Sequence, residues 1–327
     1  EVQVLRDRAP LPFAGTPGKG TLVAFSDFSS ECAAVVGVPL VGPCGGRAGE
    51  EPDQLQVRQG HVAPEAGVAG IGFGLEGEQC GAGGLPLDRR GGAGGRAAAG
   101  RAAAIADAAL VVINGGGYDH WADDVLKNHK NVTTVDAYSL LPHSAPGEAN
   151  EHVFYNMAVA KAVATKIADD LAKSDTANAD AYRANAAEFG KKADTIAATE
   201  RAIGQKHPGA AVVSTEPVAH YLLSASGVVD STPHGFAAAA EEGHDPAPAD
   251  VAAMLDLING HQVDALVVNK QTETAVTKQL QDAARKASVP IVEVTETLPA
   301  GLDFLTWQRQ TAEALAHQLD TAAAAAR

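Results

Sequence analysis

Three side chains that can bind a metal ion lie at the ends of predicted strands or at the start of a predicted helix. His152 lies just before a long helical stretch, Glu216 follows a strand at 210–215, and Glu296 follows the strand "PIVEV". Asn269 also follows a strand, "DALVV", but its amide is a poor metal ligand. One imidazole and two carboxylates form a mixed N/O set that suits zinc, manganese or iron(II) better than copper(I), which prefers sulfur ligands. The pattern therefore indicates a site for a divalent transition metal.

Each of these residues, taken alone, also has a structural explanation. A lone histidine at a helix start is usually a surface or capping residue. A glutamate such as Glu216 in the first turn of a helix is favoured by the helix dipole without any metal, and Glu296 can simply cap a loop. The joint placement is what favours the metal site, because ligands of open α/β sheets bind outside the carboxyl ends of the strands.

The elements that must position these residues alternate between strands and helices after about residue 102. Short apolar runs predict strands at 109–114, 131–137, 210–215, 264–269 and 290–295. Apolar residues at helical spacing, with proline at some starts and glycine at some ends, predict helices at 121–128, 153–173, 178–206, 217–226, 246–260, 274–288 and 303–326. This order predicts an α/β fold in which parallel sheets are covered by helices.

Residues 1–100 differ in composition from the remainder. They hold 22 of the 34 glycines and a single lysine, Lys19, and they show neither the helical nor the strand period over any sustained length. One interpretation is a flexible, glycine-rich arm. The other is that part of the segment is mis-assigned sequence, because GC-rich codons read out of frame give Gly-, Ala- and Arg-rich text. Resequencing the DNA that encodes residues 20–100 distinguishes the two, since an intact reading frame excludes the second.

The composition disfavours several classes of function. A formal charge of −15 makes nucleic acid a poor partner, because its phosphates require clustered Lys and Arg. No apolar run approaches the roughly 18–20 residues that cross a bilayer. The polar start "EVQVLRDRAP" is not a signal peptide, so we expect any export signal to lie outside these 327 residues. Cys32, Cys44 and Cys80 have no CxxC spacing and favour neither a disulfide framework nor a thiolate metal site.

From about Ile105 to the C-terminus, the chain resembles the zinc/manganese solute-binding proteins of bacterial ABC importers. "ADAALVVINGGGYDHWADDVLKN" is similar to that family's strand, Asn-Gly turn and acidic/aromatic helix start. "NEHVFYNMAVAKAVATKIADDL" resembles its second metal-histidine motif, which runs into the helix that links two lobes. "VVSTEPVAHYLLSASGV" resembles the segment that places a His or Glu ligand after a Ser or Thr, and "VPIVEVTETLPAG" resembles the site of the final carboxylate ligand.

The resemblance implies that His152, Glu216 and Glu296 bind the metal, in a cleft between the two lobes. Family members also carry a first ligand histidine in a slot that corresponds to residues 88–95 here. This slot reads "DRRGGAGG" and contains no histidine. We therefore expect either weakened affinity, with water completing the coordination shell, or a faulty sequence at this slot.

The resemblance further implies the architecture and the partners. It predicts an N-terminal lobe at 1–152, one long rigid linking helix at 153–174 and a C-terminal lobe at 175–327. Zn²⁺ or Mn²⁺ is then a transported ligand and the protein has no catalytic residues. The expected partner is the membrane permease of a metal ABC importer. We expect a monomer located outside the cytoplasm, made as a membrane-anchored lipoprotein precursor.

Two other functions compete with metal capture. One is a metal-dependent hydrolase with Glu216 or Glu296 as general base, although the sequence has no HExxH signature. The other is a surface adhesin, a label often attached to such importer components. The choice between zinc and manganese stays open at this stage. Because binding needs a neutral His152, the expectation from an ordinary imidazole is that affinity falls below about pH 6.5.

Overall fold

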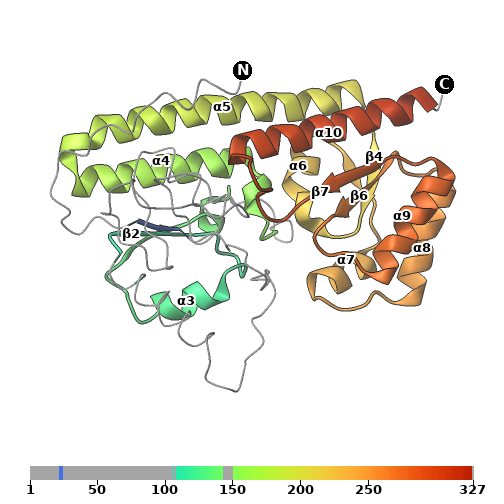
Figure 1. Cartoon of the computed structure of the whole chain (residues 1–327), viewed down its shortest axis with the longest axis horizontal. Helices are drawn as coiled ribbons and strands as arrows, with labels where there is room; N and C mark the ends of the chain where they lie inside the picture. Colours follow the sequence, from blue (N-terminus) through green and yellow to red (C-terminus); the bar gives the residue numbers. More distant parts are fainter. Residues whose placement is uncertain (1–21, 25–104, 106–107, 143–149, 326–327) are drawn as a thin grey trace, which may run out of the picture. The chain divides into compact units, whose positions relative to one another are not determined.

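The computed structural model describes residues 22–24, 105, 108–142 and 150–325 (Figure 1). The chain divides into two compact units, one made of residues 1–141 and 161–190 and the other of residues 142–160 and 191–327. Nearly all of the irregular segment 1–100, including the slot at 88–95, lies outside the described residues. The lobe boundaries expected at 152 and 174 stay a prediction.

The sheet of the first unit has three parallel strands in the order β1-β2-β3, which are Leu22–Ala24, Leu110–Ile113 and Thr133–Asp136. Every residue of β2 is buried, as expected for a strand covered on both faces. Helix α3, His120–Leu126, follows β2, and its Ala122 belongs to the same apolar cluster as Val111 and Ile113. Both predicted strands of this region are confirmed.

The turn after β2 is built by three successive glycines and one aspartate. Residues 115–117 have φ of 75°, 65° and 98°, a left-handed conformation that strains residues with a Cβ atom. At Gly115 an added Cβ would lie 2.0 Å from Asp136 Oδ1. The Asp119 carboxylate accepts the N–H groups of Asn114 and Gly115, both at 2.9 Å. The hydrogen bonds that fix the turn therefore join residues only four and five positions apart in the chain.

The sheet of the second unit has four parallel strands in the order β5-β4-β6-β7. In chain order they are β4 Ala211–Ser214, β5 Val229–Asp230, β6 Ala265–Asn269 and β7 Ile291–Val294. The helices that follow β4 in this unit are α6 His220–Ala225, α7 His234–Glu241, α8 Pro248–Asn259, α9 Ala275–Ala287 and α10 Phe304–Ala325. The predicted fold class, parallel sheets covered by helices, is confirmed.

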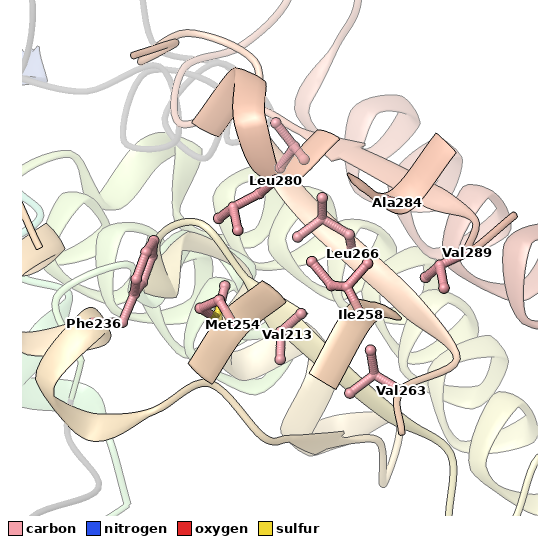
Figure 2. Close-up of a cluster of buried hydrophobic side chains, with 10 residues drawn as sticks. Val213, Phe236, Met254, Ile258, Val263, Leu266, Leu280, Ala284 and Val289 are labelled. Atoms are coloured by element: carbon pink, nitrogen blue, oxygen red, sulfur yellow. The ribbon is translucent and has the colours of Figure 1, made fainter. Parts of the chain in front are cut away.

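One face of this sheet holds a dense apolar core (Figure 2). Val213 of β4 and Leu266 of β6 pack there with side chains from three helices, Phe236 of α7, Met254 and Ile258 of α8, and Leu280 and Ala284 of α9. Successive residues of a strand point to opposite faces. Leu266 and Val268 therefore face α7–α9, whereas Val267 and Asn269 lie on the other face. The core thus fixes the carboxyl end of β6, where Asn269 lies.

Two long helices precede β4. Helix α4 spans Met157–Ser174, and α5 spans Ala179–Lys206. The helix expected to start at residue 153 starts four residues later, because a 3-10 turn, η3 (Val153–Tyr155), comes first. Asn156 Oδ1 then accepts the N–H groups of Ala158 and Val159, which satisfies donors at the start of α4.

Short elements were harder to anticipate than long ones. The sequence did not predict α7 or the two-residue strand β5, whose residues Val229 and Asp230 are both exposed.

Across the part of the chain that the structure describes, no helix has the length and apolar character needed to cross a membrane.

Candidate metal site

The strand order of the second unit places a topological switch point between β4 and β6. These two strands are neighbours, but the chain leaves β4 toward β5 and leaves β6 toward β7, on opposite sides. Such a switch point opens a crevice at the carboxyl end of a parallel sheet, where ligands bind. Glu216 lies two residues after β4, and Asn269 is the last residue of β6. Glu296 lies two residues after the next strand, β7.

His152 and Glu296 lie side by side. His152 is buried, and its Nε2 is 3.9 Å from Glu296 Oε1. On the other side of the ring, His152 Nδ1 is 2.7 Å from Asn150 Oδ1, which also accepts the backbone N–H of His152 at 2.8 Å. Asn150 Oδ1 is an amide oxygen and can only accept hydrogen bonds. His152 Nδ1 must therefore be the donor, so it carries the ring proton. The lone pair is therefore on Nε2, beside the Glu296 carboxylate.

A second layer of contacts fixes this pair. The Tyr221 hydroxyl accepts the Asn150 N–H at 3.0 Å and donates to the Asn150 carbonyl at 2.7 Å. The buried Tyr155 hydroxyl donates to the carbonyl of Thr295, next to Glu296, at 2.8 Å. The segment that carries His152 is thus tied both to α6 and to the loop after β7. Outer contacts of this kind orient metal-binding histidines.

Glu216 is held by a different loop. Asn269 Nδ2 donates to Glu216 Oε2 at 2.7 Å, and the Thr272 hydroxyl donates to Glu216 Oε1. Both carboxylate oxygens therefore accept a hydrogen bond from a neutral donor. Glu216 has extended backbone angles as the residue before the 3-10 turn η5, Pro217–Ala219, so it is not inside the first turn of a helix as expected.

The electrostatics of His152 favour the neutral ring that a metal requires. Burial, assisted by the nearby His220, lowers the pKa of His152 from 6.5 to about 4. Burial is the larger of these two causes. A pKa of about 4 lowers the pH at which His152 would be protonated, so the expected fall in metal affinity moves from about pH 6.5 to about pH 4. The pH dependence of affinity stays a prediction.

The structure brings two of the three expected ligands together. Within residues 22–24, 105, 108–142 and 150–325, no group of three or more His, Cys, Asp or Glu side chains is close enough to hold a metal ion. The set of His152, Glu216 and Glu296 consequently stays a prediction. The first histidine expected at 88–95 falls outside the described residues.

Sequence reasoning missed the residues that hold these side chains. Asn150, Tyr221 and Thr272 were not singled out, and Asn269 was considered only as a poor ligand. The Asn150-x-His152 spacing and the position of Asn269 at a strand end are visible in the sequence. The sequence does not show which residues they contact, because Tyr221 lies 71 residues from Asn150 and Glu216 lies 53 residues from Asn269.

The second unit is thus a parallel α/β unit with a buried histidine beside a carboxylate at its strand ends, a pair of side chains whose chemistry suits a divalent metal. The family model described as the zinc-uptake complex component A, periplasmic, ZnuA, matches residues 96–318, which is more than half of the chain. The chain belongs to this family. Its members are metal-capturing, solute-binding components of ABC importers that work outside the cytoplasm, a transport class rather than an enzyme class. Among curated protein sequences, none matches the chain.

Several solved structures share this fold at low sequence identity. The SBP FpvC of Pseudomonas aeruginosa in complex with Mn²⁺ has a TM-score of 0.62 at 17% identity, covering 92% of this chain and 98% of that one. A Zn(II)-bound variant of AdcAII of Streptococcus pneumoniae has a TM-score of 0.61 at 18% identity, covering 92% of this chain and 99% of that one. The laminin-binding protein Lmb of Streptococcus agalactiae has a TM-score of 0.62 at 18% identity, covering 92% and 100%.

Proposed function

We propose that this protein captures zinc or manganese through His152 and Glu296, with Glu216 as a third ligand, and delivers the ion to the permease of an ABC importer. The observation that carries this proposal is the pair formed by His152 Nε2 and Glu296 Oε1, 3.9 Å apart. Metal bonds of about 2.1 Å in tetrahedral geometry separate two donor atoms by about 3.4 Å. A cation between these two atoms therefore requires a movement of about half an ångström.

The His152–Glu296 pair can bind both zinc and manganese, and its chemistry predicts which of the two ions binds more tightly. A neutral imidazole and ionised carboxylates bind zinc and manganese, and zinc has the higher intrinsic affinity at N/O sites. We propose that the purified protein binds both ions and binds zinc more tightly. Related folds are described with Mn²⁺, Ni²⁺ and Zn(II) bound, which supports a site of this breadth.

A further histidine is part of the proposal. Its slot at 88–95 contains none in the present sequence. We propose that the encoding DNA, once resequenced, gives a histidine there that completes the ligand set. We also propose a monomer derived from a lipoprotein precursor, in keeping with the family's periplasmic description.

Adhesion is the second candidate function. The structure of Lmb is described as a bifunctional protein with adhesin and metal-transporting activity, and it shares this fold. Binding of the purified protein to immobilised laminin tests this alternative. Saturable binding that survives loss of the metal site would favour an adhesive surface in addition to metal capture.

The test of metal capture is calorimetric titration of zinc and manganese into the wild type and two variants. His152→Ala removes the nitrogen ligand and Glu296→Gln removes a charge at nearly constant volume. We expect each variant to lose on the order of a hundredfold in zinc affinity. His317→Ala, at an exposed position of α10, is the matched control and should bind as the wild type. Unchanged affinity in His152→Ala would refute the site.

A further inference from the structure

The loop between β6 and α9 contacts both segments that carry the proposed carboxylate ligands. We call residues 269–274 the β6–α9 loop. Two of its residues donate to the Glu216 carboxylate, one to each oxygen. Asn269 Nδ2 donates to Oε2 at 2.7 Å, and the Thr272 hydroxyl donates to Oε1. Asn269 is only 1% exposed, so its amide is not free to turn toward solvent.

The same loop fixes the backbone at Glu296. Gln271 Oε1 accepts the N–H groups of Glu296 at 2.8 Å and Thr297 at 3.0 Å. Gln271 Nε2 donates to the Thr297 hydroxyl at 2.5 Å, and the Gln271 N–H donates to Asn269 Oδ1 at 3.1 Å. One short loop therefore determines both the side-chain direction of Glu216 and the backbone position of Glu296.

Both ends of the β6–α9 loop are held by packing or hydrogen bonds. On one side, β6 is anchored by Leu266 in the apolar core (Figure 2). The Asn269 N–H also donates to the Thr215 hydroxyl at 3.1 Å. On the other side, Thr274 begins α9 with reciprocal hydrogen bonds to Thr277, a capping box. A loop fixed at both ends can hold a partner side chain in one orientation without losing much conformational entropy on binding.

We infer that Asn269 and Thr272 are positioning residues that hold the Glu216 carboxylate for the metal, while Gln271 sets the position of Glu296. This inference rests on the proposed function. A carboxylate has about four lone-pair directions, and the two donors use one on each oxygen. Within the part of the chain that the structure describes, one direction on each oxygen is not used by these hydrogen bonds and can face a cation. Because the donors are neutral, they orient the carboxylate and leave its negative charge in place.

Thr272 offers the cleanest test because its side chain is exposed, so substitution should leave the fold intact. Thr272→Val removes the hydroxyl at nearly constant volume, and Thr272→Ser retains it. We expect Thr272→Val to weaken zinc binding about tenfold, the lower range for loss of a contact that orients a ligand, and Thr272→Ser to bind as the wild type. Thr321→Val, an exposed threonine of α10 whose hydroxyl bonds only to a backbone carbonyl in the described contacts, is the control.

The double variant distinguishes positioning from a general structural effect. If Thr272 acts through Glu216, Thr272→Val should have no further effect on zinc affinity once Glu216→Gln is present. Visible absorption of bound cobalt(II), which reports the ligand geometry, should change in Thr272→Val and return in Thr272→Ser. Calorimetry gives the affinities of the wild type and of the five variants.

The possible results separate this inference from the proposed function. Wild-type affinity in Thr272→Val, additive losses in the double variant, or unchanged affinity in Glu216→Gln would each overturn the positioning role, while zinc capture by His152 would still stand on its own titration. A wild type that binds neither zinc nor manganese would instead refute the proposed function, and the inference with it.

Discussion

Asp119 in the first unit and Glu216 in the second each follow a buried parallel strand, and their carboxylates are held in different ways. Asp119, after β2, accepts two backbone N–H groups from four and five residues away in the chain. Glu216, after β4, accepts one amide and one hydroxyl from side chains 53 and 56 residues away. The first carboxylate completes its own turn, whereas the second is oriented by another loop at a topological switch point.

The comparison shows how a structural carboxylate differs from one arranged for a ligand. Asp119 is 4% exposed, and burial raises the pKa of its carboxyl to about 6. Its hydrogen bonds close the Asn-Gly turn, so its function is complete within the fold. Glu216 is partly exposed, and among the described residues its carboxylate accepts hydrogen bonds from two neutral donors. We therefore expect substitutions at the two positions to change different measured quantities.

The largest expected effect concerns Glu216. Glu216→Gln should lower zinc affinity on the order of a hundredfold, about 2.7 kcal/mol, because a neutral amide is a weak ligand. The melting temperature should change little. Asp119→Asn should show the reverse pattern, with wild-type zinc affinity and a lower melting temperature, since an amide has one acceptor oxygen for two N–H groups. Calorimetry and thermal unfolding of both variants measure these effects. Equal loss of affinity in both would abolish the distinction.

A smaller effect is expected at the turn itself. Gly115→Ala places a Cβ at φ 75° and 2.0 Å from Asp136 Oδ1. The left-handed conformation and the displaced carboxylate should lower the free energy of unfolding by about 2 kcal/mol. Urea denaturation measures this change. Gly209→Ala is the matched control, because it also has positive φ, 79°, but no atom lies within 4 Å of its added Cβ. If both variants lose equal stability, the contact with Asp136 contributes nothing.

The smallest effect is a pH dependence that belongs to Asp119. Its pKa is about 6 in the folded protein against an ordinary 3.8, so the folded state binds more protons between these values. The stability from protonated Asp119 is complete below the unfolded pKa and is lost as pH rises through 6. Relative to Asp119→Asn, the wild type should therefore gain about 1 kcal/mol between pH 7 and pH 5. Denaturation of both proteins at the two pH values checks this, and a constant difference would contradict it.

The long elements could be predicted because each carries its own local signal. The buried run of β6 and the proline- and glycine-bounded helix α8 are visible in the sequence without knowledge of their neighbours. The two-residue strand β5 carries no such signal. The start of α4 was misplaced because Asn156, an N-terminal capping residue, comes after the 3-10 turn rather than before it.

The site could be predicted in part, because some of its residues also carry local signals in the sequence. His152 and Glu296 were identified by chain position and by resemblance, and the structure places them 3.9 Å apart. The orientation of the histidine by Asn150 and of Glu216 by Thr272 depends on long-range hydrogen bonds that no local pattern encodes. The pKa of His152 could not be anticipated either, because burial is a property of the folded chain.

The most direct test of the account is a crystal structure of the protein grown with zinc, with the ion located by its anomalous scattering. We expect one zinc ion about 2.0–2.2 Å from His152 Nε2 and from a carboxylate oxygen of Glu296, with Glu216 in the same coordination sphere. A zinc ion bound elsewhere, with His152 and Glu296 still in contact with each other and not with the metal, would contradict it.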